Sequence, residues 1–217
     1  ALKIKQPPAT DSTPVFASIG QGLRFVFNNQ VMLGAQALDM FAVLFGGAVA
    51  MLPMFIHDVF NYGPEGLGIL RAAPAMGAIA TGLWLTRHPI NRHAGRILLI
   101  AVAGFGLSII AFALSGNFWL AAFLLMISGI CDGVSVVVRS TIMQLVTPDE
   151  MRGRVSAING IFIGSSNELG AFESGVMARL LGLIPSVIFG GVMTITVVGA
   201  VAKWAPKLRR LSMRDLY

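Results

Sequence analysis

The sequence predicts an all-α polytopic membrane protein with six transmembrane helices. Of its 217 residues, 55% are hydrophobic and only 12% are charged, whereas about a quarter of the residues of a soluble domain are charged. A hydrocarbon core roughly 30 Å thick takes about 20 helical residues to cross, and no strand-like alternation competes with the apolar runs of that length. Six such runs occur, at 31–56, 66–86, 96–114, 118–146, 155–181 and 184–203. A water-soluble globule is therefore excluded.

The first thirty residues differ from the rest of the chain. Residues 1–17 are polar and rich in proline, a composition that is typical of a linker. In residues 18–30 the apolar side chains of Ile19, Leu23 and Phe27 recur at helical spacing between polar ones. This pattern predicts a short helix that lies in the membrane interface before the first span.

Basic residues predict the orientation. All but three of the 16 Lys and Arg residues lie in the segments 1–30, 86–96, 147–154 and 203–217, which share one side of a six-span protein. The positive-inside rule places that side, and both ends of the chain, in the cytoplasm. The net charge of +6 is then an orientation signal, and it does not predict a nucleic-acid partner.

These segments divide the chain into four parts: the linker, the interfacial helix, a six-helix bundle at 31–203 and a basic cytoplasmic tail at 204–217. The chain begins with Ala1 and with a linker, which is an unusual start for a membrane protein. We therefore expect it to be the later part of a longer chain.

Charged residues inside the spans are few and periodic. Each costs at least about 2.5 to 3.5 kcal/mol at the centre of a membrane helix, so each needs a partner or a water-filled cavity. Two spans with charges are followed by one without, and this order occurs twice, as a 3+3 repeat would produce. The residues are Asp39 in the first span, Arg71 in the second, Asp132 and Arg139 in the fourth, and Glu168 and Glu173 in the fifth.

Depth in the membrane suggests roles for these charges. At a rise of 1.5 Å per residue, Asp132 and Glu168 fall near the midplane, and Asp132 lies on a serine-containing stripe of its helix. Asp132, Glu173 and Glu168 are therefore candidates for carboxylates that line a cavity and carry protons. Asp39 and Arg139 lie nearer the cytoplasm and are a candidate charge pair, either structural or linked to substrate. Snorkelling to the interface is the favoured interpretation of Arg71.

A polar connection between the fourth and fifth spans is the sharpest local motif. Thr147 and Glu150 have the spacing of a capping box, with Pro148 at the first helical position, which predicts a short cytoplasmic helix. Its arginines are expected to reach the carbonyl ends or acids of neighbouring helices and to hold the two spans together. The candidate residues of this cytoplasmic gate are Asp149, Glu150, Arg152 and Arg154.

Together these features resemble the C-terminal six-helix half of a major facilitator superfamily transporter, over about residues 18–210. The stretches 23–26, 132–140, 147–155, 166–170 and 172–175 resemble its enterobactin-exporter and drug-efflux-like branch. The resemblance implies a twelve-helix transporter that works by alternating access, with an N-terminal half missing from this chain as partner. Thr86 stands where the family has an acid in its other loop motif, so the segment 149–154 is the better gate candidate.

The predicted function is secondary active transport, as proton-coupled export of a small siderophore-like or drug-like molecule across the bacterial inner membrane. The expected partners are the lipid bilayer, the substrate and protons. No Gly-x-Ser-x-Gly, His-Glu-x-x-His or Walker motif occurs. We therefore expect that the protein is not an enzyme and binds no cofactor. Cys131 is the only cysteine and the three histidines lie in loops without matching acids, so no metal site is expected. The alternative is a non-transporting membrane scaffold or receptor whose buried ion pairs are structural.

Overall fold

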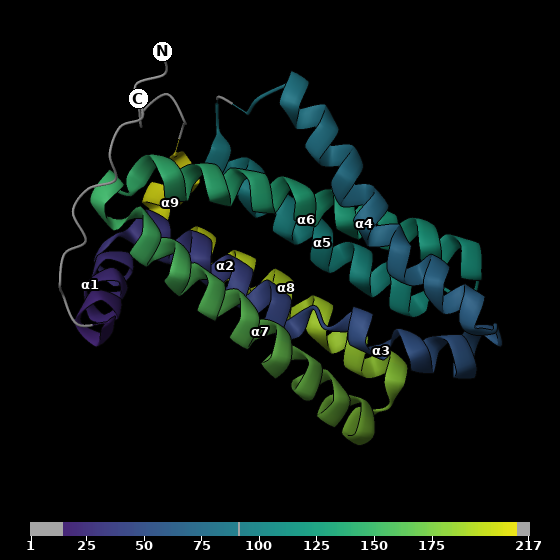
Figure 1. Ribbon diagram of the computed structural model, residues 1–217. Helices are drawn as coiled ribbons and strands as arrows, with labels where there is room; N and C mark the ends of the chain where they lie inside the picture. Colours follow the sequence, from purple (N-terminus) through teal and green to yellow (C-terminus); the bar gives the residue numbers. More distant parts are fainter. Residues whose placement is uncertain (1–14, 91, 212–217) are drawn as a thin grey trace, which may run out of the picture.

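The computed structural model describes residues 15–90 and 92–211 and shows helices joined by short turns (Figure 1). In this part of the chain there is no strand, and the prediction of an all-α protein is confirmed. Most of the expected linker and the last residues of the expected tail lie outside the described residues. The elements are α1 (Val15–Asn28), α2 (Gln30–Phe45), α3 (Ala48–Phe55), the π-helical turn η1 (Ile56–Phe60), α4 (Pro64–Arg87), α5 (Ala94–Leu114), α6 (Phe118–Val146), the 3₁₀ turn η2 (Asp149–Met151), α7 (Arg152–Leu181), α8 (Leu183–Trp204) and α9 (Pro206–Arg210).

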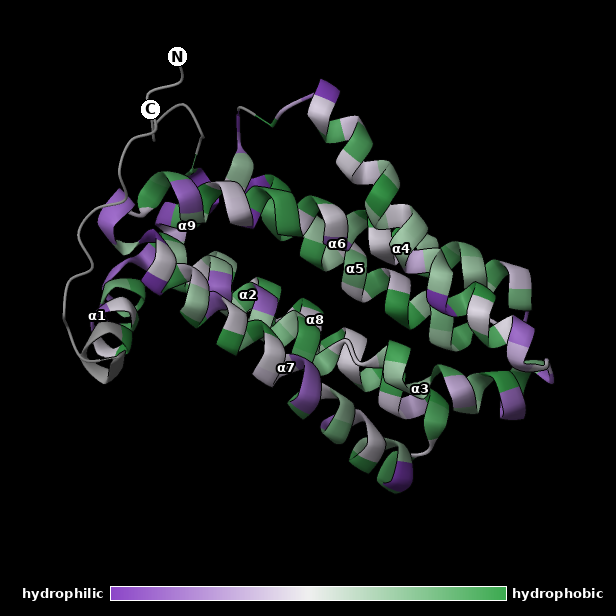
Figure 2. Ribbon diagram, viewed as in Figure 1, coloured by the Kyte–Doolittle hydropathy of each residue, from purple (hydrophilic) through white to green (hydrophobic). Residues whose placement is uncertain are grey.

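Five helical segments among the described residues are long and apolar enough to cross a membrane. They are Gln30–Phe60, which combines α2, α3 and η1, then Pro64–Arg87, Ala94–Leu114, Phe118–Val146 and Leu183–Trp204. The remaining predicted span, 155–181, lies in α7, which has 30 residues but falls below the same hydropathy criterion because glycine and polar residues interrupt it. Figure 2 shows purple patches along α7, whereas α5 and α8 are mainly green. Five spans are thus supported, and α7 as the sixth stays a prediction.

Glycines break the first of these segments in its middle. The helix is interrupted at Gly46 and Gly47, where helix α5 contributes Phe105 and helix α7 contributes Ser174. A Cβ on Gly46 would lie 2.6 Å from a ring carbon of Phe105, and a Cβ on Gly47 would collide with the Ser174 hydroxyl. Two residues without side chains therefore allow both helices to approach the break closely.

The ends of the other helices follow local sequence signals. The Asn29 side chain accepts hydrogen bonds from the backbone amides of Val31 and Met32 at 3.0 and 3.2 Å, which caps α2. Asn117 caps α6 in the same way. Helix α4 begins at a proline, where no amide hydrogen is needed.

The helices form two groups. Helix α6 packs on α4 and α5, helix α2 packs on α7 and α8, and the contact between α5 and α8 joins the groups, as Figure 1 shows. The crossing of α4 and α6 is close because Gly129 and Gly133 of α6 face it: a Cβ on Gly129 would overlap the backbone of Pro74, and one on Gly133 would lie 3.1 Å from the Cα of Ala78. Small residues let membrane helices pack at such short range.

Two apolar clusters lie toward opposite ends of the bundle and leave a polar layer between them. One includes Phe112 and Leu125, and the other, beside α9, includes Leu98 and Ile142. Helix α6 runs through both clusters, and Asp132 lies between its contributions to them. The fold therefore places this carboxylate where the apolar packing is interrupted.

Candidate functional site

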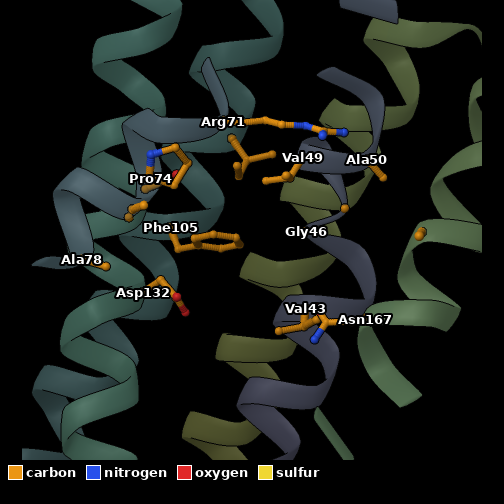
Figure 3. Close-up of a pocket in the computed structure, with 16 residues that line it drawn as sticks. Val43, Gly46, Val49, Ala50, Arg71, Pro74, Ala78, Phe105, Asp132 and Asn167 are labelled. Atoms are coloured by element: carbon orange, nitrogen blue, oxygen red, sulfur yellow. The ribbon is translucent and has the colours of Figure 1, made fainter. Parts of the chain in front are cut away.

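A cavity of about 510 Å³ occupies the interrupted region. Residues of α2, α3, α4, α5, α6 and α7 and of the Gly46–Gly47 break line it, and most of them are small and apolar. Its charged lining residues are Asp132 and Arg71, and Ser128 and Asn167 add polar groups. Figure 3 shows Asp132 at one end of the cavity, while Arg71 extends across the other end toward Val49 and Ala50.

Asp132 connects this cavity with a smaller one. It lies at the midpoint of α6 and is exposed. It also lines a cavity of about 20 Å³ together with Asp39, Cys131 and Ser135. Roughly 10 to 15 Å³ is enough for one water molecule, so the small cavity that Asp132 and Asp39 both line has room for a single water.

Asp39 and Arg139 form a buried ion pair between α2 and α6. The Arg139 Nη1 donates a hydrogen bond to Asp39 Oδ1, and each side chain is only 8% exposed. An isolated charge at this depth would be strongly unfavourable. The pair therefore holds the two groups of helices together where they meet beside the cavity.

Polar contacts continue from this pair toward α7. Arg139 lines a further cavity of about 10 Å³ together with Gln36. The Gln36 Nε2 donates a hydrogen bond of 2.8 Å to Asn159 Oδ1 on α7. Polar groups thus run from Asp132 through the ion pair to the N-terminal half of α7.

The two acids of α7 lie outside the cavity lining. Glu168 is exposed, and Glu173 is half-buried. The Oε2 of Glu173 accepts a hydrogen bond of 3.5 Å from the Ser174 hydroxyl, whereas its buried Oε1 has no hydrogen-bond partner among the described residues. The structure therefore brings Asp132, Asp39 and Arg139 together and leaves Glu168 and Glu173 apart from them.

The segment expected to form a cytoplasmic gate connects α6, α7 and α1. Arg152 forms an ion pair with Asp149 at 3.0 Å and donates to the Gln144 carbonyl at 3.3 Å. Arg154 donates to Gln21 Oε1 of α1 at 2.7 Å. These contacts join the C-terminal end of one helix to the start of the next.

The capping box expected in this segment does not form. Its threonine, Thr147, donates to the sulfur of Met32 at 4.0 Å, and no side chain caps η2. Glu150 is exposed. Because the Thr147 side chain is buried against α2, its hydroxyl is turned away from the amides that it was expected to cap.

Sequence reasoning missed two lining residues, Arg71 and Asn167. Arg71 was expected to snorkel outward, but it lines the cavity. The available signal was its charge within a span, which favours a cavity over lipid. Among the described residues, no group of three or more His, Cys, Asp or Glu side chains is arranged to hold a metal ion.

Comparison with known proteins assigns the chain to a family. The family model of the transmembrane secretion effectors, within the major facilitator superfamily, matches residues 5–216. The chain belongs to this family. The resemblance found in the sequence is therefore confirmed: the chain is a multi-pass membrane protein of an efflux-transporter family, which is a family of transporters and not of enzymes.

Two curated relatives of the chain are transport proteins. It is 27% identical over 203 residues to the multidrug efflux pump Tap of Mycolicibacterium fortuitum, which covers 92% of this chain and 48% of Tap. It is 25% identical over 158 residues to the enterobactin exporter EntS of Escherichia coli O81 (strain ED1a), which covers 73% of this chain and 38% of EntS. The chain thus spans less than half of the length of these two relatives. No solved structure matches it at the significance applied to these relatives.

Proposed function

We propose that this chain is one half of a secondary active transporter that exports a small organic molecule in exchange for protons. One observation carries the proposal: Asp132, an exposed carboxylate at the midpoint of a membrane helix, opens into a 510 Å³ cavity. A carboxylate that changes between charged and neutral forms can carry a proton and alter the attraction of the cavity for a cation. The family and the efflux relatives support export as the direction.

In this proposal Asp39 and Arg139 form a charge pair that changes with the state of the transporter. Asp132 and Asp39 line the same small cavity, so Arg139 has two carboxylates close to it. Protonation of one carboxylate favours pairing of Arg139 with the other, because the neutral acid attracts the guanidinium less. Glu168 and Glu173 are candidates for further proton-carrying groups on α7.

We propose that α7 is the sixth span and that the bundle is a 3+3 repeat. The first repeat would consist of α2 with α3, α4 and α5. The second repeat would consist of α6, α7 and α8. Their packing corresponds: α4 packs on α6 as α7 packs on α2, and α5 packs on α6 as α8 packs on α2. A repeat related by a two-fold axis requires such pairs of contacts.

The proposed topology has both ends of the chain in the cytoplasm of a bacterial cell, in the inner membrane. Basic residues on the α6–α7 connection and on α9 support it. Asp149, Glu150, Arg152 and Arg154 would then form the cytoplasmic gate, which opens as α6 and α7 separate. A second six-helix half would complete the cavity, in agreement with the length of the relatives.

Proteoliposomes that contain the complete protein test the proton mechanism. Transport of the cationic drug ethidium is measured with and without an imposed pH gradient, for the wild type and Asp132→Asn. We expect the gradient to drive transport in the wild type and to have no effect in the variant. Glu65→Gln, which removes an exposed acid outside the cavity lining, is the matched control. Flux that ignores the gradient and is unaffected by Asp132→Asn removes the proton mechanism.

A further inference from the structure

Arg71 is a cation in an apolar helix. It lies seven residues after the start of α4, which is about 10 Å along the helix axis. The side chain is exposed, and it lines the large cavity. Figure 3 shows it extending across one end of the cavity from α4 toward Val49 and Ala50 of α3.

The Arg71 guanidinium is unpaired in the part of the chain that the structure describes. Among the described residues, Arg71 takes part in no hydrogen bond or ion pair, whereas Arg139 is paired with Asp39. Five N–H donors arranged in a fixed fork suit a carboxylate or phosphate. A cavity end that exposes this fork, with its acid, Asp132, at the opposite end, has the chemistry of an anion-binding site.

The rest of the cavity defines the shape of the molecule that would bind there. Asp132 lies at the opposite end from Arg71, and Pro74 and Phe105 lie between them (Figure 3). The wall between the two charges is therefore mainly apolar. A complementary molecule has an apolar body with an anionic group at one end and a cationic group at the other.

We propose that Arg71 binds the anionic group of the exported compound, so that the cavity selects zwitterionic organic molecules with an apolar body. This inference rests on the proposed function and names the substrate class of the same cavity. Arg71 pairs with a carboxylate or similar anion through two parallel hydrogen bonds, and Asp132, when ionised, attracts the cationic end. An apolar cation without an acidic group lacks the Arg71 contact and binds more weakly.

Binding of two related dyes tests this selectivity. Rhodamine B has a carboxylate and a delocalised cation on one apolar scaffold, and its ethyl ester retains only the cation. The complete protein is placed in phosphatidylcholine nanodiscs, and the dissociation constant of each dye is measured by fluorescence anisotropy, with empty nanodiscs as background. We expect the wild type to bind rhodamine B more tightly than the ester.

The variants Arg71→Gln and Arg71→Lys separate the anion contact from a general loss of structure. Loss of a hydrogen-bonded charge pair typically weakens binding about tenfold or more, so we expect Arg71→Gln to weaken rhodamine B by that factor and to leave the ester unchanged. Arg71→Lys retains the charge without the fork and should lie between these results. Arg179→Gln, at an exposed arginine of the last turn of α7 outside the cavity lining, should bind both dyes as the wild type does.

Several results would overturn the inference. One is equal affinity of the wild type for both dyes, and another is binding of neither dye. The others are an equal loss of affinity for both dyes in Arg71→Gln, and a loss of rhodamine B affinity in Arg179→Gln as large as that in Arg71→Gln. The measurement is repeated in nanodiscs that contain phosphatidylglycerol, an anionic lipid. If the preference for rhodamine B then disappears, the anion site binds a lipid headgroup instead of the exported compound. Binding needs no gradient, so a dye preference with gradient-independent transport would support the inference and remove only the proton mechanism.

Discussion

Helices α6 and α7 are nearly equal in length, 29 and 30 residues, yet the surroundings of their charged side chains differ. Helix α6 is apolar, exposes Asp132 to a cavity and buries Arg139 in an ion pair. Helix α7 exposes Glu168 and leaves one oxygen of Glu173 without a partner among the described residues. The sequence of a helix does not define the role of its own charges, because neighbouring helices supply the partners.

The glycines of the two helices differ in the same way. Gly129 and Gly133 on α6, like Gly160 and Gly164 on α7, have the Gly-x-x-x-Gly spacing. A Cβ on Gly129 would overlap α4, whereas Cβ atoms on Gly160 and Gly164 would meet no other atom within 4 Å. Helix α6 is packed through its glycines, and no described residue covers the face of α7 that carries Gly160 and Gly164. This open face is available to the second half that we propose.

The largest expected effect is that of removing one member of the buried ion pair. Arg139→Gln leaves Asp39 charged without a partner, which should lower the free energy of unfolding by about 3 to 5 kcal/mol. The double variant Asp39→Asn with Arg139→Gln should recover much of the loss. Thermal denaturation of the complete protein in detergent measures both.

The same double variant separates a structural pair from a functional one. A stable double variant that no longer transports ethidium indicates that the pair changes during the cycle. A stable double variant with unchanged transport supports the structural interpretation. A double variant as unstable as Arg139→Gln would contradict mutual compensation of the two charges.

A second effect tests the packing difference between the helices. Gly129→Val places methyl groups against the α4 backbone and should cost about 1 to 3 kcal/mol, while Gly164→Val on the open face of α7 should cost less. Thermal denaturation midpoints of the two variants give the comparison. Equal losses would show that the face of α7 is as closely packed as that of α6.

A smaller effect of opposite sign is expected on α7. Glu173→Gln keeps the shape of the side chain and removes a partly buried charge that has an unpartnered oxygen, so it should stabilise the protein by about 1 kcal/mol. The measurement is the unfolding free energy in detergent, with Glu65→Gln as an exposed control. A loss of stability would reveal a partner of Glu173 outside this chain.

The smallest effect is expected for Glu168. This side chain is exposed, so Glu168→Gln should change stability by no more than about 0.5 kcal/mol. Transport of ethidium by the variant is then measured at several pH values. Reduced transport at unchanged stability would assign Glu168 a role in function, and a large loss of stability would contradict its exposure.

The sequence predicted the helices better than their contacts. The predicted span 118–146 matches α6, and 96–114 differs from α5 by two residues at one end, because asparagine caps, prolines and charged turns act locally. The break at Gly46–Gly47 was not anticipated, since it depends on Phe105 and Ser174 from other helices. The family resemblance could be found from short motifs because it needs no tertiary information.

The sequence predicted the depth of the charged residues along their helices, but not the direction in which their side chains point. Asp39 and Arg139 were expected at similar depths, and they pair. Arg71 was expected at the interface and Glu173 in the cavity, but the structure places Arg71 in the cavity lining and Glu173 elsewhere. Helical spacing tells which residues share a face, and only the neighbours decide whether that face meets lipid, a cavity or another helix.

An all-α membrane protein could be recognised from the sequence, because apolar run length and charge scarcity act through the bilayer on each helix separately. The resemblance to an efflux-transporter family came from short motifs. Tertiary structure alone decided that Asp132 and Arg71 share one cavity and that Arg139 is paired with Asp39. The physical reason is that the free energy of a charge in a membrane depends on the groups within a few ångströms of it. Those groups come from helices that are distant in the chain.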